Sequence, residues 1–375
     1  MPQQSAQANQ NADVVVIGGG VIGLSIARAL ALRGVRNVTV IEKGEFGREA
    51  SWAAGGILAP QVEADKADDF FRLACAGRDL YPKFAQALFE ETAIDVELDT
   101  TGTLYVAFSE QEENEFRARF IWQRSEGLEV QWLNGAEARA LEANLSDQVR
   151  CALRFPRDYQ VDNRCLVEAL VNSNRRSGVR LIDNCAVNRF CVAGDHVEGV
   201  ETDEGFVRAA SVVVAAGAWS SAFNLEVKPV RGQMLCFRPE RQMARHVIYS
   251  SRGYLIPRRD GRLVAGSTSE RVGFDKQVTQ EGIETIKTMA AEISPALALL
   301  PHVDSWAGFR PRAHDGLPVL GESPEIRRLF YATGHYRNGI LLAPITAELM
   351  AEAILKDEIS SLLSPFSPRR VTLHV

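Results

Sequence analysis

The sequence lacks the cysteine patterns of a disulfide-stapled or metal-binding protein. It has six cysteines in 375 residues, and they form no C-x-x-C pair and no ligand pair with a nearby histidine. A chain of this length buries about three quarters of its unfolded surface without such staples. We therefore expect reduced thiols in a cytoplasmic protein, and no bound metal.

An excess of basic charge and long apolar runs are also missing. With 42 basic and 48 acidic residues the net charge is -6, which disfavours a partner held through its phosphates. The longest uncharged stretch, 209–225, has 17 residues and contains Gly217, so it is too short for a membrane span. Residues 1–12 are polar without the features of a targeting segment, and we expect a disordered tail. Nucleic-acid and membrane partners are therefore not expected.

The first ordered pattern is a strand, a glycine turn and a helix. The apolar run 14–17 suits a buried parallel strand and leads into Gly18-x-Gly20-x-x-Gly23. A helical pattern and a second buried strand follow, and that strand ends at Glu42. In such a unit the glycines allow a tight turn, a close approach to a pyrophosphate and close helix packing, while the acid accepts from a ribose hydroxyl. The pattern predicts dinucleotide binding.

Three later segments favour FAD over NAD as the dinucleotide. A loop of small residues at 51–56 offers free backbone amides, and the apolar strand 212–216 ends in a glycine turn at Gly217. The segment 331–344 carries a glycine-rich turn into a helix N-terminus, which can face an anionic flavin edge. Each signal is weak alone, but together they indicate FAD.

The order of these elements predicts an α/β fold in two domains. Buried parallel-type strands occur in three separated stretches, with antiparallel material between them. We expect a Rossmann-like FAD-binding domain assembled from three segments and an inserted, mainly antiparallel α+β substrate domain. The predicted FAD-binding segments are 13–95, 150–225 and 305–370, and the predicted substrate-binding segments are 96–149 and 226–304.

Several motifs in the same order along nearly the whole chain resemble those of a known family. They are VVVIGGGVIG with Glu42 and Lys43, SWAAGGIL, PVRGQM at 229–234, YLIPRRDGRLVAGST, WAGFRPRAHDGLPVLG at 306–321, GHYRNGILLAP and FSPRR. The sequence resembles the D-amino acid oxidase type of flavoproteins, and most closely the bacterial glycine oxidases of thiazole biosynthesis. The resemblance implies a homotetramer with a flavin that is not covalently linked, because 306–321 contains no cysteine where related sarcosine oxidases attach the ring.

The resemblance also implies the residues of the site. Arg310, Tyr254 and Arg337 would bind the substrate. With the glycines of the βαβ unit included, the predicted FAD contacts are Gly18, Gly20, Val21, Ile22, Gly23, Glu42, Lys43, Ala50, Ser51, Gly55, Gly56, Ile57, Val187, Gly217, Gly334, His335, Tyr336, Arg337, Asn338, Gly339, Ile340 and Leu341. The chain departs from the family at Ala50-Ser51, where Thr-Thr is frequent, and at Trp52, which is bulkier than usual.

The chemistry of these side chains agrees with the implied roles. A guanidinium fork at Arg310 suits an amino-acid carboxylate, with a structural salt bridge as the alternative. Tyr254 could instead be a core tyrosine, and Arg337 could cap carbonyls. His335 is expected at the flavin rather than as a base, because hydride transfer to flavin N5 requires no side-chain catalyst.

We therefore expect an FAD-dependent oxidase of glycine and other small amino acids or amines such as sarcosine. It would yield glyoxylate, ammonia and hydrogen peroxide with molecular oxygen as the acceptor, and would feed thiazole synthesis for thiamine. One alternative is a D-amino acid dehydrogenase with a quinone acceptor. A second is a non-catalytic FAD-binding subunit of a larger complex.

Overall fold

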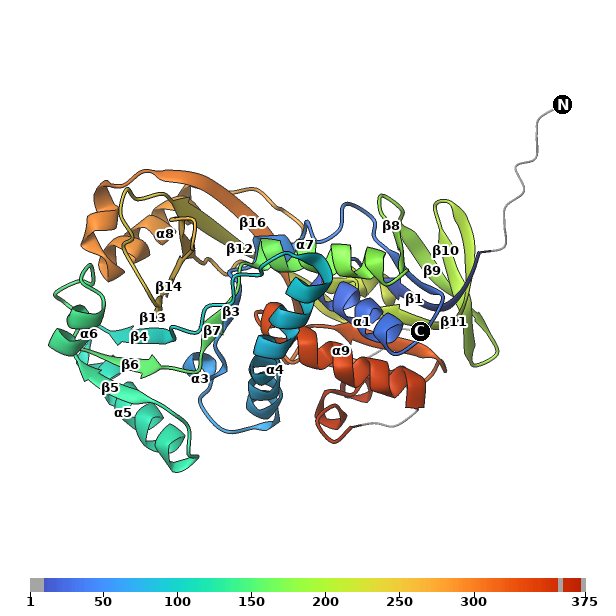
Figure 1. The fold of residues 1–375 in the computed structure, drawn as a ribbon, viewed down its shortest axis with the longest axis horizontal. Helices are drawn as coiled ribbons and strands as arrows, with labels where there is room; N and C mark the ends of the chain where they lie inside the picture. The colour runs from blue at the N-terminus through green and yellow to red at the C-terminus, as the bar shows by residue number, and fades with distance from the viewer. Residues whose placement is uncertain (1–9, 357–359, 372–375) are drawn as a thin grey trace.

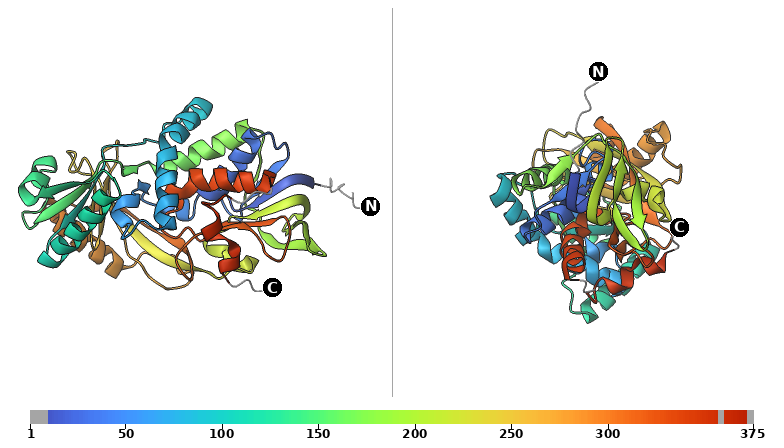
Figure 2. Two further views of the ribbon diagram at one scale, coloured as in Figure 1. Left: turned by 90° about the horizontal axis from the view of Figure 1, so that it is seen from below. Right: turned by 90° about the vertical axis from the view of Figure 1, so that its right-hand side faces the viewer.

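Two eight-stranded sheets, one toward each end of an elongated molecule, organise the chain (Figure 1). The computed structural model describes residues 10–356 and 360–371. Figure 2 shows the same two halves from two further directions. The residues predicted as a tail divide accordingly: 1–9 lie outside the described residues, whereas residues 10–12 belong to the first strand, since they pair with β11.

The first sheet has the strand order β17-β18-β11-β1-β2-β8, in which every pair except the antiparallel β17–β18 is parallel, and a β9–β10 hairpin pairs with β11. Its strands are β1 (Gln10–Ile17), β2 (Val38–Ile41), β8 (Arg180–Ile182), β9 (Val187–Ala193), β10 (His196–Thr202), β11 (Gly205–Val214), β17 (Val319–Glu322) and β18 (Leu329–Thr333). Residues 14–17 of β1 are buried on both faces, which explains their uninterrupted apolar run.

Helices cover one face of this sheet. Val14 and Val16 pack in one core with the helices, whereas Val15 and Ile17 pack on the other face with side chains of the β9–β11 segment. The covering helices are α1 (Val21–Leu32), α4 (Asp69–Thr92), α7 (Asn163–Arg176) and α9 (Gly339–Lys356). Three short 3₁₀ helices also belong to this half: η1 (Gly217–Phe223), η3 (Ser364–Phe366) and η4 (Pro368–Arg370).

The second sheet has the order β16-β12-β15-β14-β13-β4-β6-β5, and every pair except β13–β4 is antiparallel. Its strands are β4 (Thr103–Ala107), β5 (Gln131–Asn134), β6 (Cys151–Phe155), β12 (Val227–Phe237), β13 (Val247–Ser250), β14 (Gly253–Pro257), β15 (Leu263–Gly266) and β16 (His302–Ala313). The elements packed around it are α5 (Glu110–Ser125), α6 (Gly135–Leu141), α8 (Gln280–Ile293) and η2 (Pro295–Leu299). The predicted α/β class with a mainly antiparallel second unit is confirmed.

Strand pairing corrects the segment boundaries drawn from the sequence. β6 falls in the segment assigned to the FAD-binding domain, but it pairs with β4 and β5 of the second sheet. Most of β16 also falls in a segment assigned to the FAD-binding domain, but β16 pairs along its length with β12 of the second sheet. Periodicity could not reveal these pairings, because the sequence pattern of a strand does not specify which distant strand it pairs with. The division into two domains stays a proposal with these strands moved.

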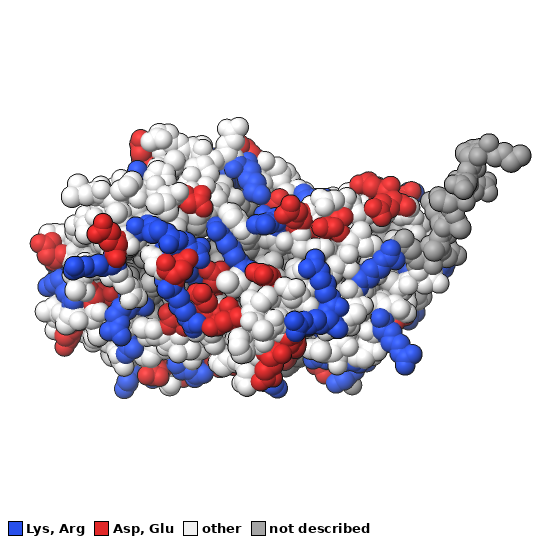
Figure 3. Space-filling view, turned by 45° about the horizontal axis from the view of Figure 1, so that its top comes forward, with Lys and Arg blue, Asp and Glu red and all other residues white. Residues whose placement is uncertain are grey.

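Short elements run between the two sheets. They are α2 (Ala50–Ala53), α3 (Pro60–Glu63) and the ribbon of β3 (Ile57–Leu58) and β7 (Tyr159–Gln160). Acidic and basic side chains intermingle on the surface shown in Figure 3. Every helix within the described ranges is too short or too polar to cross a membrane.

A buried arginine in the turn after β14 ties the second sheet to the first half. Arg258, 8% exposed, donates through Nη1 to the Val161 carbonyl at 2.7 Å and through Nη2 to the Gly55 carbonyl at 2.7 Å. Its Nη2 also donates to Oδ1 of Asn163 at 3.2 Å. The amide of Asn163 in turn donates to the carbonyls of Ser51 and Trp52 at 2.8 and 2.9 Å. The loop 51–56 is thereby held from behind by two side chains.

We predict that Arg258→Met destabilises the protein by about 3 kcal/mol, because three buried acceptors lose a charged donor. Arg259→Met is the matched control. That neighbouring arginine is exposed and pairs with Asp95 on the surface, so its loss should cost less than about 1 kcal/mol. Urea unfolding of both variants measures the difference. Equal losses would contradict a role for Arg258 in joining the two halves.

Candidate functional site

A cavity lies where the two sheets meet, and most of the predicted site residues line it. Arg310, Tyr254 and Arg337 are in its wall. The predicted FAD contacts in the wall are Gly18, Gly20, Val21, Ile22, Glu42, Lys43, Ala50, Ser51, Gly55, Gly56, Ile57, Val187, Gly217, His335, Tyr336, Arg337, Asn338, Gly339 and Ile340. The structure places Gly23, Gly334 and Leu341 behind the wall. Segments that lie far apart in the chain thus converge on one cavity.

The glycine turn after β1 has the geometry of a phosphate cradle. Gly18 has φ +108°, and a Cβ there would lie 2.4 Å from the Ala215 carbonyl oxygen. A Cβ at Gly23 would lie 2.0 Å from the Gly18 oxygen, so this glycine serves helix packing, which is why it is absent from the wall. At Gly20 the nearest atom to a Cβ is Ser51 Oγ at 3.2 Å, and the position borders the cavity. A side chain there would fill the space where the backbone meets a phosphate.

The N-terminus of α1 faces this turn without a side-chain cap at Gly20. One amide is satisfied from another element, because the Val21 amide donates to Ser51 Oγ at 2.9 Å. The helix dipole and the remaining first-turn amides favour an anion at this end. At the end of β2, Glu42 accepts from the amides of Gly19 at 2.7 Å and Gly44 at 3.1 Å. The turn, the helix end and the acid fit a dinucleotide such as FAD.

The loop of small residues forms the adjoining wall. Gly56 has φ +72°, and a Cβ there would lie 2.0 Å from the Val161 carbonyl oxygen. The bulky Trp52 points out of the cavity, where its ring packs against Trp306 at 5.9 Å and under the Arg164 guanidinium at 3.7 Å. The bulky side chain that departs from the family pattern therefore does not line the cavity, because it packs behind the loop.

An aromatic side chain that sequence reasoning missed covers Lys43. The Lys43 ammonium lies 3.2 Å from the centroid of the Trp219 ring, and Phe274 stacks on the same ring at 5.2 Å. Burial lowers the pKa of Lys43. The sequence signal for Trp219 was present, since it stands two residues after Gly217 in the glycine turn. Phe274 carried no such signal because its segment lies far away in the chain.

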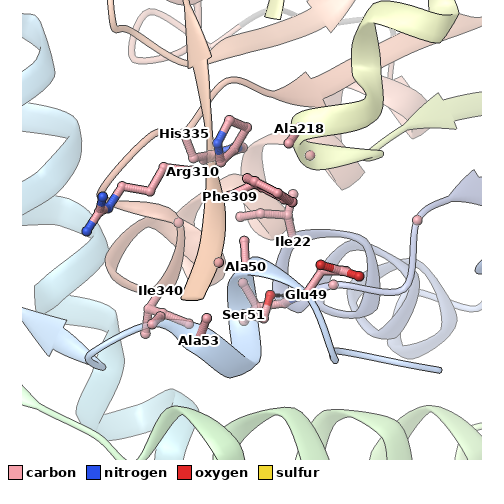
Figure 4. A pocket seen from close by; sticks show the side chains of 18 of the residues that line it. Ile22, Glu49, Ala50, Ser51, Ala53, Ala218, Phe309, Arg310, His335 and Ile340 are labelled. Atoms are coloured by element: carbon pink, nitrogen blue, oxygen red, sulfur yellow. Dashed lines mark hydrogen bonds between the residues drawn. The ribbon is translucent and has the colours of Figure 1, made fainter. Parts of the chain in front are cut away.

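The walls also contain residues that were not predicted as site residues, although Met234 and Phe309 stand within two of the family motifs. Their type is ordinary, and only the convergence of distant segments brings them together. They include Glu49, Glu63, Met234, Tyr249 and Phe309. Figure 4 shows Arg310 reaching from β16 to one side of the cavity, with Glu49, Ala50 and Ser51 on the other side.

Arg310 and Tyr254 share one hydroxyl group. Arg310 Nη2 donates to Ser267 Oγ at 2.6 Å and Nη1 donates to the Thr268 carbonyl at 3.0 Å. The Tyr254 hydroxyl donates to the same Ser267 Oγ at 3.1 Å. Gly232 makes room for the guanidinium, since a Cβ there would lie 2.3 Å from its nitrogens. Within the described residues the recorded partners of Arg310 are all neutral, so the salt-bridge alternative for Arg310 finds no support there.

Arg337 is paired instead. Its Nη2 donates to Glu63 Oε1 at 2.9 Å, and this carboxylate raises the pKa of Arg337. The Tyr249 hydroxyl donates to the same carboxylate oxygen at 3.4 Å. Arg337 is half-exposed at the edge of the cavity. The two predicted substrate arginines thus face one cavity, and they differ in whether a carboxylate of the described residues neutralises them.

His335 lies in the glycine-rich turn before α9. It is 3% exposed, and its Nε2 is 3.1 Å from Thr346 Oγ1. Burial lowers the pKa of His335 to about 3, so the imidazole is neutral at pH 7. A neutral ring held by Thr346 agrees with a residue that shapes the turn.

The chain is similar to known oxidases over nearly its full length. The model of the family described as FAD dependent oxidoreductase (DAO) matches residues 13–353. Glycine oxidase from Pseudomonas aeruginosa is 37% identical over 362 residues, which cover 95% of this chain and 98% of that protein. The bifunctional protein ThiO/ThiG from Trichormus variabilis is 38% identical over 94% of this chain, which spans 54% of that longer protein. The crystal structure of glycine oxidase from Geobacillus kaustophilus superposes with a TM-score of 0.92 at 34% identity, covering 98% of this chain and 100% of that one.

The fold and the cavity define a flavoprotein in which a mainly antiparallel sheet covers a dinucleotide-binding one. Within this class, the chain belongs to the DAO family of FAD dependent oxidoreductases. The predicted family is therefore confirmed, as is FAD as the cofactor.

We predict that His335 makes stability sensitive to acid. Its folded pKa of about 3 lies below the ordinary 6.5, so the unfolded chain binds a proton that the folded chain does not. Stability from this group is present above pH 6.5 and is lost as the pH falls toward 3, by about 2 kcal/mol between pH 7 and 5. Urea unfolding of wild type and His335→Gln at both pH values isolates this contribution. An identical pH dependence in the two proteins would contradict the prediction.

Proposed function

We propose that this protein is an FAD-dependent oxidase that deaminates glycine and other small amino acids or amines. Glycine yields glyoxylate and ammonia, and oxygen is reduced to hydrogen peroxide. The proposal is supported by the match to glycine oxidases over nearly the whole chain. The D-amino acid dehydrogenase and the non-catalytic subunit find no comparable support.

The observation that carries the proposal is the charge state around Arg310. Its guanidinium faces the cavity and is held by a serine hydroxyl and a backbone carbonyl, both neutral. A cation in a partly dry site is stabilised most by an anion, and a planar carboxylate fits a guanidinium fork. An amino-acid substrate supplies that carboxylate. The Ser267 hydroxyl fixes the fork and Tyr254 together, so the two substrate residues are pre-positioned.

FAD, when bound, supplies the acceptor of a hydride from the substrate α-carbon. The turn at Gly18–Gly20 and the α1 N-terminus would hold its phosphates, and Glu42 its ribose. Arg310 orients the substrate by its carboxylate, which sets the position of the α-carbon. Lys43 and Trp219 line one side of the cavity, and Phe274 stacks on the Trp219 ring. No residue is assigned as a general base, because the amine loses its proton to solvent.

We further propose the context of this activity. Relatives whose printed name joins ThiO to ThiG support a role in supplying thiazole synthesis for thiamine. A cytoplasmic location and a homotetramer are inferred from resemblance to the family. The bulky side chains of Met234 and Tyr249, which contact Tyr254 in the cavity wall, support a preference for small substrates.

The direct test is oxygen uptake by the purified holoenzyme. Glycine and sarcosine should support turnover with stoichiometric hydrogen peroxide, and glycine should exceed D-phenylalanine in kcat/KM. Turnover with a quinone but not with oxygen would instead favour the dehydrogenase. No turnover with any amino acid under either acceptor would favour the non-catalytic subunit.

For Arg310, we predict that replacement by Ala lowers kcat/KM for glycine by roughly 30- to 1000-fold, which corresponds to about 2–4 kcal/mol. Arg310→Lys should restore activity in part, because an ammonium lacks the planar fork. Arg312→Ala is the matched control, since it lies two residues along β16 and does not itself line the cavity, where its guanidinium reaches only the back of the wall residue Tyr336. Kinetics are expressed per bound flavin. Unchanged kcat/KM in Arg310→Ala would remove this residue from the site.

We also predict that FAD is bound without a covalent link. The stretch 306–321 contains no cysteine, and the cysteines that the structure places are absent from the cavity wall. Acid precipitation should therefore release yellow FAD into the supernatant. Colour that remains with the pellet would show the opposite.

A further inference from the structure

Glu63 occupies a position in the cavity that bears on substrate choice. It is the last residue of α3 and contacts two other residues of the wall, Arg337 at 2.9 Å and the Tyr249 hydroxyl at 3.4 Å. We propose that Glu63 sets the substrate class by charge: by neutralising Arg337 it restricts the site to amino acids and amines with one carboxylate and excludes those with a second acidic group. This inference rests on the proposed function and refines it.

The first step in the argument is that Glu63 is held in place. α3 begins at Pro60, and the amides of Gln61 and Val62 donate to the buried Asp158 at 3.3 and 3.0 Å. Arg119, reaching across from α5, donates to the Val62 carbonyl at 2.9 Å. Because the short helix is fixed at both its amides and its carbonyls, the backbone of Glu63 is held at the position from which its carboxylate reaches Arg337.

The second step is that Glu63 and Arg310 belong to one continuous wall. Arg310 and Tyr254 meet at Ser267, the Tyr254 and Tyr249 rings lie 5.3 Å apart, and Tyr249 reaches Glu63. A substrate held by Arg310 therefore lies along the side of the cavity that leads to Glu63. Burial raises the pKa of Tyr249 well above its usual value, so its hydroxyl remains a donor to the carboxylate.

The third step is the charge balance. Of the two arginines, Arg337 is neutralised by Glu63, whereas the recorded contacts of Arg310 are neutral. The carboxylate of one substrate molecule compensates the positive charge of Arg310. A second acidic group would meet an arginine already occupied and the negative charge of Glu63, and the repulsion discriminates against it. If Glu63 loses its charge, Arg337 becomes a second seat for an acidic group.

The test compares pairs of compounds that differ only by an acidic group. Iminodiacetate is measured against its monoamide, and D-aspartate against D-asparagine, as kcat/KM per bound flavin. In Glu63→Gln the ratio of acid to amide should rise by roughly tenfold or more in at least one pair. Arg337→Met leaves Glu63 without its cation, so there the ratio should fall below wild type.

Binding without turnover gives a second readout. Succinate and its monoamide, succinamate, are titrated into the oxidised holoenzyme, and the change in flavin absorbance reports their dissociation constants. In Glu63→Gln the dissociation constant of succinate should fall relative to that of succinamate by a similar factor. This measurement does not require that glycine is a substrate, so it tests the role of Glu63 even if the proposed function fails.

Two further variants separate the role of Glu63 from a general loss of charge. Glu49→Gln removes another carboxylate of the wall, one that pairs with Lys276 at 2.6 Å, and should leave the acid-to-amide ratio unchanged. Glu63→Gln combined with Arg337→Met should abolish the gain. Acid-to-amide ratios in Glu63→Gln equal to wild type in every pair would overturn the inference, as would the same gain in Glu49→Gln. Absence of glycine turnover in wild type would instead count against the proposed function.

Discussion

The attachment of the second sheet to the cofactor loop is the constraint on which the rest of the site depends. Arg258 leaves the second sheet and gives its guanidinium hydrogens to the carbonyls of Val161 and Gly55, and to Asn163. Asn163 extends the same network to the loop 51–56. Because Arg258 and Asn163 bind carbonyls of this loop on the side away from the cavity, the opposite side of the loop is free to line the cavity. The hairpin that carries Arg258 also carries Tyr254, so cofactor wall and substrate wall are aligned by one set of buried hydrogen bonds.

Charge is distributed unequally inside this frame. The glycine turn and the α1 N-terminus offer partial positive charge from the backbone, while Glu42 is occupied by the Gly19 and Gly44 amides. At the other end, Arg310 is a full cation with neutral partners and Arg337 is a cation with a carboxylate. This distribution of charge supports the proposal that phosphates bind at one end of the cavity and a single carboxylate at the other. A neutral amino acid is the simplest ligand that satisfies the second condition.

Small side chains make these placements possible. Gly232 leaves room for the Arg310 guanidinium, and a Cβ at Gly308 would come within 2.4 Å of the Ala53 Cβ, so β16 and α2 approach closely only because one of them has no side chain at that point. Neither glycine stands in a pattern that marks a phosphate loop. They are required by contacts between segments more than 70 residues apart in the chain, so the sequence alone did not show what either glycine does, although both stand in family motifs.

The sequence by itself determined the local units. The apolar run of β1, the glycine spacing and Glu42 define a βαβ unit through local sterics and periodicity, and the family motifs indicated FAD and the substrate arginine. The tertiary structure alone decided which strands join which sheet, because the partners of β6 and β16 lie far away in the chain and the sequence of each strand does not specify them. It also decided that Arg310 and Arg337 differ. Their guanidinium groups are chemically identical, and the carboxylate that separates them, Glu63, comes from a short helix that no motif marked.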